Sequence, residues 1–372
     1  MKLKDFSLTS SRFVRLSFLI HIVIMWSCTP DPVKDGSLSD IPYAPHNKIL
    51  EIPSHFPKMD IPSDNPLTEE GVLLGRYLFY DPILSADSTM TCSSCHIQSK
   101  NFTDGLPTSQ GIDGINGRRS AMSLVNIGFV KVGFFWDGRS KTLEEQALAP
   151  VEDPVELHNH WGELIDKLKA HPTYPKLFRE AFGIDHKDKI TKELAAKAIA
   201  QFERTLISKD SKFDRWQQGI ENLSDIELIG NGIYFDDDPD LPDGECGHCH
   251  NIPLAATDDY FNNGLFAAKS LTDFIDLGRG EVTKQLNDNG KFRAPTLRNI
   301  RHSAPYMHDG SLATFDEVLK HYNSGGKESV YKDKVLHKLG LDEFYLNCLS
   351  AFIDTFEDTT FLHNPEFSNP FK

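Results

Sequence analysis

The chain has 372 residues, of which 39% are hydrophobic and 25% charged, and its formal net charge is −15. This composition is that of an ordinary globular protein, and the length accommodates two domains of typical size. The acidic balance argues against a nucleic-acid partner, which needs a basic surface, and no internal run is apolar enough to span a membrane.

The first 27 residues are typical of a signal peptide: four basic side chains precede a mostly apolar stretch at 16–26 that is too short to span a bilayer. Cys28 follows Ser27 at the expected cleavage point and resembles a bacterial lipoprotein site. We therefore expect a protein of the periplasm or cell envelope that is held at the membrane through a lipid on Cys28. Met25 and Trp26 depart from the usual pattern, and a plain secretory signal is the alternative.

Cleavage after residue 27 would remove a net charge of +3 and leave −18 on the mature chain. Such a charge permits steering of a basic partner, for example a small basic cytochrome. Residues 28–66 are rich in Pro and polar residues, which is typical of a tether.

Further along the chain the pattern is mainly helical. A helix is expected to end at Gly183, another to begin after Thr191, and capping boxes at Ser224 and Thr314 predict two more helix starts. Alternating β-branched runs are scarce. The acidic run at 236–240 lacks the Gly of a calcium loop and is interpreted as a solvated loop.

The cysteines carry the strongest chemical signal, because two copies of C-x-x-C-H occur. This motif attaches c-type haem: the two thiols add to the vinyl groups of one haem, and the His ligates its iron. The residues concerned are Cys92, Cys95, His96, Cys246, Cys249 and His250. Zinc would need further ligands, and two disulfides would explain neither His. Cys348 lies in an apolar stretch and is expected to be a buried thiol.

The two halves share three segments in one order. LTEEGVLLGRYLFYD corresponds to LSDIELIGNGIYFD, SLVNI to TLRNI, and FWDGRSKTLEE to MHDGSLATFDE. We therefore predict a mainly α fold of two c-type cytochrome domains related by internal duplication, at residues 67–220 and 221–372, with haem-centred cores and long loops.

From residue 67 to about 356 the chain resembles the bacterial di-haem cytochrome c peroxidases, which include the MauG-type enzymes. The resemblance rests on both haem motifs, on FFWDGR at 134–139 with the LEEQA that follows, and on FRAPTLRNIRHSAPYMHDG at 292–310. It implies that hydrogen peroxide is reduced at the N-terminal haem and that the C-terminal haem receives electrons from a small redox protein, such as a cytochrome c.

The resemblance also implies roles near the first haem. Ile112 stands where some members have a His that blocks the iron, so the first haem is expected to be open, unless His158 or His160 intrudes. Gln146 and Glu156 match the residues that handle peroxide, Glu156 as acid and base.

Near the second haem, Tyr322 falls at the position of the distal iron ligand, with His321 and Met307 as alternatives. Trp136 lies in the segment that the family places between the haems and is expected to relay electrons. Ser120 replaces an Asn that helps to hold calcium in the family, which weakens the expectation of a calcium ion.

Three functions follow as hypotheses. The first is a peroxidase that reduces hydrogen peroxide with electrons from a small protein. The second is a MauG-type oxidase that modifies a protein substrate, which Ile112 and Tyr322 also favour. The third is a non-enzymatic di-haem electron carrier, which an open first haem disfavours. The sequence leaves open whether the chain forms a homodimer.

Overall fold

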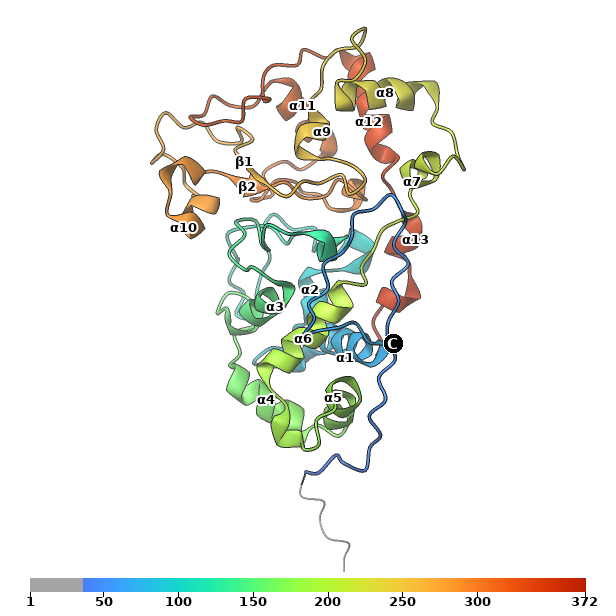
Figure 1. The fold of residues 1–372 in the computed structure, drawn as a ribbon. Helices are drawn as coiled ribbons and strands as arrows, with labels where there is room; N and C mark the ends of the chain where they lie inside the picture. The colour runs from blue at the N-terminus through green and yellow to red at the C-terminus, as the bar shows by residue number, and fades with distance from the viewer. Residues whose placement is uncertain (1–35) are drawn as a thin grey trace, which may run out of the picture. The chain divides into compact units, whose positions relative to one another are not determined.

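The computed structural model describes residues 36–372 (Figure 1). The expected signal peptide, Cys28 and the first part of the expected tether lie outside the described residues. Within the described part, no helix is both long and apolar enough to cross a membrane.

The first half of the described chain is mainly helical, as expected. Its helices are α1 (Glu69–Tyr80), α2 (Cys92–Cys95), α3 (Leu143–Glu152), α4 (Trp161–Ala170), α5 (Tyr174–Phe182), α6 (Lys192–Glu203) and α7 (Lys212–Gln217). Short 3-10 turns lie at Pro82–Leu84, Gln98–Lys100, Ile127–Phe129 and Lys187–Lys189.

The second half is helical as well and contains the two strands of the described chain. Its helices are α8 (Asp225–Phe235), α9 (Cys246–Cys249), α10 (Arg279–Thr283), α11 (Phe315–Asn323), α12 (Glu343–Asp354) and α13 (Thr359–Leu362). Strand β1 (Tyr260–Phe261) pairs antiparallel with β2 (Phe292–Arg293), with Tyr260 opposite Arg293. Three further 3-10 turns lie at Leu286–Asp288, Ile300–His302 and Pro365–Phe367.

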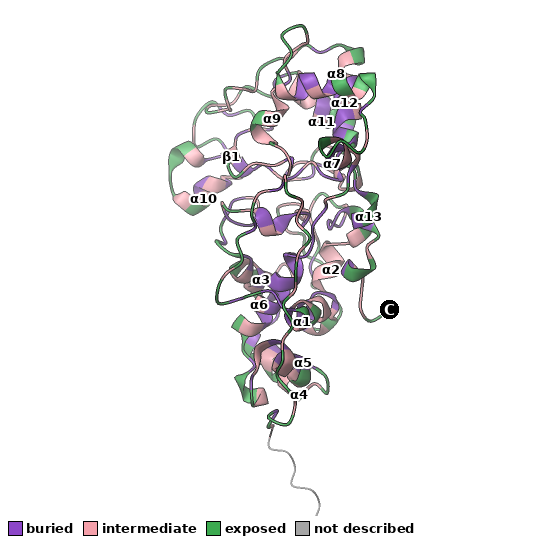
Figure 2. Cartoon of the chain, turned by 45° about the vertical axis from the view of Figure 1, so that its right-hand side comes forward, coloured by how far each residue is buried: buried purple, intermediate pink, exposed green. Residues whose placement is uncertain are grey.

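Each half is built on one pair of packed helices, α1 with α6 and α8 with α12. Both crossings depend on a glycine: a Cβ on Gly75 would overlap the carbonyl oxygen of Ala198, and a Cβ on Gly230 would overlap that of Cys348. The backbones can therefore approach closely only because these positions lack a side chain. In each pair one helix, α6 or α12, carries many buried residues (Figure 2).

The local predictions about helix ends are confirmed. Thr191 caps α6, and Gly183 ends α5 in the left-handed conformation. Capping boxes begin α8 at Ser224 and α11 at Thr314. Cys348 is 1% exposed, as expected for a buried thiol, and the acidic run at 236–240 is exposed throughout.

Contacts between distant segments hold the halves together. Asp214 and Arg298 form an ion pair in which both side chains are fully buried, and Arg298 also donates to the carbonyl of Pro253. Residues 36–66, which include part of the expected tether, bury Phe56, whose ring lies against Arg298.

The C-terminal segment crosses back onto the first half. Phe361 and Phe367 are buried in the same apolar cluster as Phe79 of α1, and the guanidinium of Arg76 donates to the carbonyl of Ser368. The last residues of the chain therefore pack on α1 rather than on the second half.

Candidate haem sites

The first Cys pair forms the short helix α2, and His96 follows at its end. The Nδ1 of His96 lies 2.8 Å from the carbonyl oxygen of Phe102. Because a carbonyl only accepts, Nδ1 carries the proton and Nε2 is left with a free lone pair, which is the arrangement of an iron-ligating His. Burial lowers the pKa of His96, so the neutral, ligating form is favoured.

The second Cys pair repeats this arrangement on α9. The Nδ1 of His250 donates to the carbonyl of Pro295 at 3.0 Å, and the hydroxyl of Tyr234 donates to the carbonyl of His250 at 2.5 Å. Burial lowers the pKa of His250 to about 4. The ring is therefore neutral at pH 7, with its Nε2 available as a ligand.

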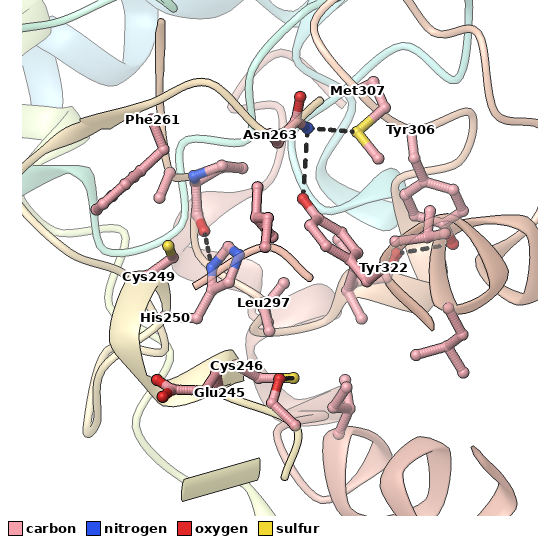
Figure 3. Close-up of a pocket in the computed structure, with 18 of the residues that line it drawn as sticks. Glu245, Cys246, Cys249, His250, Phe261, Asn263, Leu297, Tyr306, Met307 and Tyr322 are labelled. Atoms are coloured by element: carbon pink, nitrogen blue, oxygen red, sulfur yellow. Dashed lines mark hydrogen bonds between the residues drawn. The ribbon is translucent and has the colours of Figure 1, made fainter. Parts of the chain in front are cut away.

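A largely apolar cavity opens beside the second Cys pair (Figure 3). Cys246, Cys249 and His250 line it together with Leu297 and Tyr322. Apolar side chains, among them those of α11 and α12, form most of its wall, and it is partly open to solvent. Two thiols, an oriented His and a large apolar cavity together fit a haem group.

The side chains of Asn263, Met307 and Tyr322 meet in this cavity (Figure 3). The amide nitrogen of Asn263 lies 3.4 Å from the hydroxyl of Tyr322 and 3.3 Å from the sulfur of Met307. Burial raises the pKa of Tyr322 to about 12. Both Tyr322 and Met307 thus line the cavity, whereas His321 holds its Nε2 against the carbonyl of Asn263.

Comparison with known proteins agrees with this geometry. The family model described as di-haem cytochrome c peroxidase matches residues 69–222. The chain is 33% identical to the methylamine utilization protein MauG of Methylorubrum extorquens, over 79% of this chain and 80% of that protein. It is 35% identical to the cytochrome c551 peroxidase of Nitrosomonas europaea, over 71% of this chain and 76% of that protein.

The chain belongs to the di-haem cytochrome c peroxidase and MauG family. Haem is therefore its cofactor. Among solved structures, a MauG-like protein associated with microbial copper homeostasis is 32% identical, with a TM-score of 0.78 over 87% of this chain and 99% of that one.

Around the first haem site, the structure brings Glu156 and Ile112 together. The backbone N–H of Ile112 donates to the carbonyl of Glu156 at 3.0 Å, and a Cβ on Gly111 would overlap the carbonyl of Val155. The loop that carries Ile112 therefore packs directly on the Glu156 turn.

Glu156 has a perturbed acidity. Burial, helped by the charge of Asp153 and opposed by that of Arg139, raises its pKa to about 7. Its charge also acts on Cys92 and Cys95, which places it near the first Cys pair. Gln146 lies on α3, half-buried, and its side chain makes no hydrogen bond within the described chain.

The two alternative histidines near this site have other surroundings. His158 is exposed, and its Nδ1 lies 2.5 Å from a carboxylate oxygen of Asp113. His160 is an exposed residue at the N-cap of α4.

Trp136 belongs to the first half of the chain but lines the cavity of the second haem site. Its indole N–H donates to the carbonyl of Ser120 at 2.9 Å. Its ring packs edge-on against His308 at 6.4 Å between centroids, and His308 stacks on Phe292 at 3.6 Å. A run of aromatic rings therefore leads from Trp136 through His308 to Phe292.

At the position that holds calcium in the family, Ser120 donates its hydroxyl to the carbonyl of Met307. The neighbouring Arg119 pairs with Asp137 and Asp276. Both carboxylates thus already have a cationic partner. Within residues 36–372, the single group of three acidic side chains close enough to share an ion is Asp236, Asp243 and Glu245, partly exposed and outside this region.

Two residues of the second site were not identified from the sequence. Asn263 lies in an irregular loop with no motif around it, and only the structure brings it to Tyr322. His308 could have been found, because it stands in HDG where the first half has Trp136 in WDG.

Proposed function

We propose that the protein reduces hydrogen peroxide to water, H2O2 + 2 e⁻ + 2 H⁺ → 2 H2O, with electrons from a small redox protein such as a cytochrome c. The observation that carries this proposal is Glu156, a half-buried acid with a pKa of about 7 close to the first Cys pair. Ile112 packs on its turn and offers no atom that could ligate iron.

Two covalent c-type haems are part of this proposal. Thioether bonds would form at Cys92 and Cys95, and at Cys246 and Cys249. The iron ligands would be the Nε2 atoms of His96 and His250, which the hydrogen bonds from their Nδ1 atoms to backbone carbonyls leave free. The position of Tyr322 in the second cavity supports it as the distal ligand there.

When bound, the haems supply the iron that binds peroxide and the centres that pass electrons. The chain's own contribution at the first site is acid–base chemistry. Glu156 would accept the proton of the near peroxide oxygen and return it to the far oxygen, for which a pKa near the working pH is best. The amide of Gln146 would orient the peroxide.

Between the sites, Trp136 would relay electrons. It belongs to the first half, lines the second cavity and contacts the ring of His308. These contacts support a path through the WDG and HDG segments.

We also infer that the two halves arose by duplication, with a boundary near 219–223. The support is structural as well as sequential: Gly75 and Gly230 occupy the helix crossings, and Thr142 and Thr314 cap α3 and α11. Export by residues 1–27, a lipid on Cys28 and a periplasmic location complete the proposal.

The test is steady-state turnover by the oxidised two-haem protein mixed with peroxide and a reduced small cytochrome c. Continuous oxidation of the cytochrome, with two equivalents consumed per peroxide, is expected. Reaction with peroxide without any oxidation of the cytochrome would contradict the proposal and favour a MauG-type oxidase. The position of Tyr322 in the second cavity is compatible with that alternative. If the protein did not react with peroxide at all, the result would favour a non-enzymatic electron carrier.

A further inference from the structure

Arg293 is a buried cation without a partner. Its side chain is 5% exposed, and its Nε makes no hydrogen bond. The polar contact of its guanidinium is a weak one, from Nη2 to the sulfur of Met122 at 3.5 Å. Within residues 36–372 no carboxylate lies within ion-pair distance of it.

The backbone holds Arg293 firmly at this place. Its N–H donates to the carbonyl of Trp136 at 2.9 Å, and its strand position is paired with Tyr260. Burial lowers the pKa of Arg293, but only to about 10, so the side chain is charged at pH 7.

An unpaired buried charge is costly and is retained where something compensates it. The buried ion pair of Arg298 with Asp214 illustrates the usual solution in the same segment. Arg293 lines two adjoining cavities, one together with Glu245 and the other together with Asp258. The charge of Asp258 raises the pKa of Arg293, but neither carboxylate forms an ion pair with it. The guanidinium therefore has donors free for an anion that does not belong to the polypeptide.

One of the two cavities that Arg293 lines indicates which anion this is. The same cavity contains Cys246, Cys249 and His250, and a haem attached there brings two propionate carboxylates that cannot diffuse away. Guanidinium groups bind carboxylates through two parallel N–H donors, more strongly than an ammonium does. We propose that Arg293 binds a propionate of the second haem, on the side of the cavity that adjoins Trp136.

This inference rests on haem attachment at Cys246 and Cys249 and not on peroxide reduction. It has an electrostatic consequence. A fixed positive charge beside the haem favours the added electron, and a propionate stripped of its partner disfavours it. Removal of the Arg293 charge should therefore shift the second haem toward its oxidised form.

The experiment is a redox titration of the two-haem protein, followed by visible spectra of each haem, for wild type, Arg293→Met and Arg293→Lys. In Arg293→Met the reduction equilibrium of the second haem should shift about tenfold or more toward the oxidised form, while Arg293→Lys shifts it less. Arg279→Met is the matched control, because Arg279 donates to the carbonyls of Asp137 and Gly138 and does not line the cavity. It should change the equilibrium by less than about threefold.

Haem content and added anions separate the outcomes. A preparation without two haems would contradict haem attachment, whereas an unchanged potential in a two-haem Arg293→Met protein overturns this inference alone. A shift confined to the first haem would also overturn it. So would a wild-type potential that varies with added phosphate or acetate more than that of Arg293→Met, since Arg293 would then bind a free anion.

If Arg293→Met does not accumulate, resonance Raman spectra of the reduced wild type and of Arg293→Lys test whether Arg293 binds the propionate. Lys keeps the charge but loses the forked donors. The propionate-bending band of the second haem should therefore move, and an unmoved band would overturn the proposal.

Discussion

The two candidate haem sites share the way in which their His is held and differ in the residues that we propose for the opposite side of the iron. Both hold a His by its Nδ1 against a backbone carbonyl, at Phe102 in one half and at Pro295 in the other. In the sequence, Pro150 lies as far after Asp137 as Tyr322 lies after Asp309. A residue that cannot ligate thus stands where the second half has a phenol.

This difference teaches how one fold supports two tasks. In each site, a backbone carbonyl fixes the orientation of the His that would ligate the iron, so this side of the site tolerates little change. The opposite side is formed by single side chains, such as Glu156 in one half and Tyr322 with Asn263 in the other. If the first site is the reactive one and the second the relay, as we propose, a few substitutions on that side would separate the two tasks.

The largest effect is expected from removal of either Cys pair. Cys92→Ala with Cys95→Ala should leave one covalent haem per chain by mass spectrometry in denaturant, and should abolish the reaction with peroxide. Cys246→Ala with Cys249→Ala should also leave one haem, but the protein should still react with peroxide while failing to oxidise a donor continuously. Identical behaviour of the two variants would contradict the division of tasks.

The next effect concerns Glu156. Glu156→Gln keeps the size of the side chain and removes its proton chemistry, so peroxide cleavage should slow about 10²–10⁴-fold in stopped-flow mixing. Cyanide binding should change far less. The control is Glu152→Gln, which changes an exposed acid in the last turn of α3.

The pH profile sharpens the same point. Because Glu156 must be ionised to accept a proton, the wild-type rate should rise as pH passes about 7. The sign for stability is opposite: the raised pKa stabilises the folded state below the ordinary value of 4.5, and this contribution is lost as pH rises through about 7. A rate of Glu156→Gln equal to that of wild type would remove Glu156 from the mechanism.

How much of this could be predicted from sequence depends on the range of the contacts. The haem motifs, the end of α5 at Gly183 and the capping box at Thr314 are set by residues a few positions apart, and they were predicted. The packing of Phe367 on α1 and the approach of Asn263 to Tyr322 depend on loops that close over long stretches of chain. No local pattern encodes such contacts, so the sequence did not indicate them.

The buried pair of Asp214 and Arg298 has no counterpart in the first half, where Val125 stands at the position of Arg298. Asp214→Asn should lower the free energy of unfolding by about 3–5 kcal/mol, because it leaves the Arg298 charge buried and unpaired. Asp354→Asn is the control: it breaks the exposed pair with Arg301 and should cost at most about 1 kcal/mol in denaturant titrations.

The acid side of the pH profile tests the same pair. Burial raises the pKa of Asp214, but the hydrogen bonds and charge of Arg298 outweigh it and lower the pKa below its ordinary value of 3.8. The contribution of the pair is therefore present above pH 3.8 and is lost as pH falls through the lowered pKa. Equal stability losses for Asp214→Asn and Asp354→Asn would contradict the special role of this junction.

The smallest effect is expected from Tyr322→Phe, which removes a single hydroxyl group. If the phenol oxygen ligates the second iron, its loss should change the visible spectrum of that haem and raise its potential, because an anionic oxygen ligand favours the oxidised iron. The first haem should keep its spectrum and its reaction with peroxide. Tyr306→Phe is the matched control: Tyr306 lines the same cavity, but its hydroxyl donates to the carbonyl of Ile300 at 3.2 Å.

Met307 supplies the competing outcome, since its sulfur and the Tyr322 hydroxyl both lie within reach of the Asn263 amide. Met307→Leu removes the sulfur and keeps an apolar side chain of similar size. A spectrum of the second haem that is altered by Met307→Leu and untouched by Tyr322→Phe would assign the ligand to Met307. A spectrum altered by Tyr322→Phe alone assigns the ligand to Tyr322, a residue whose counterpart in the first half, Pro150, has no side-chain atom that could ligate iron.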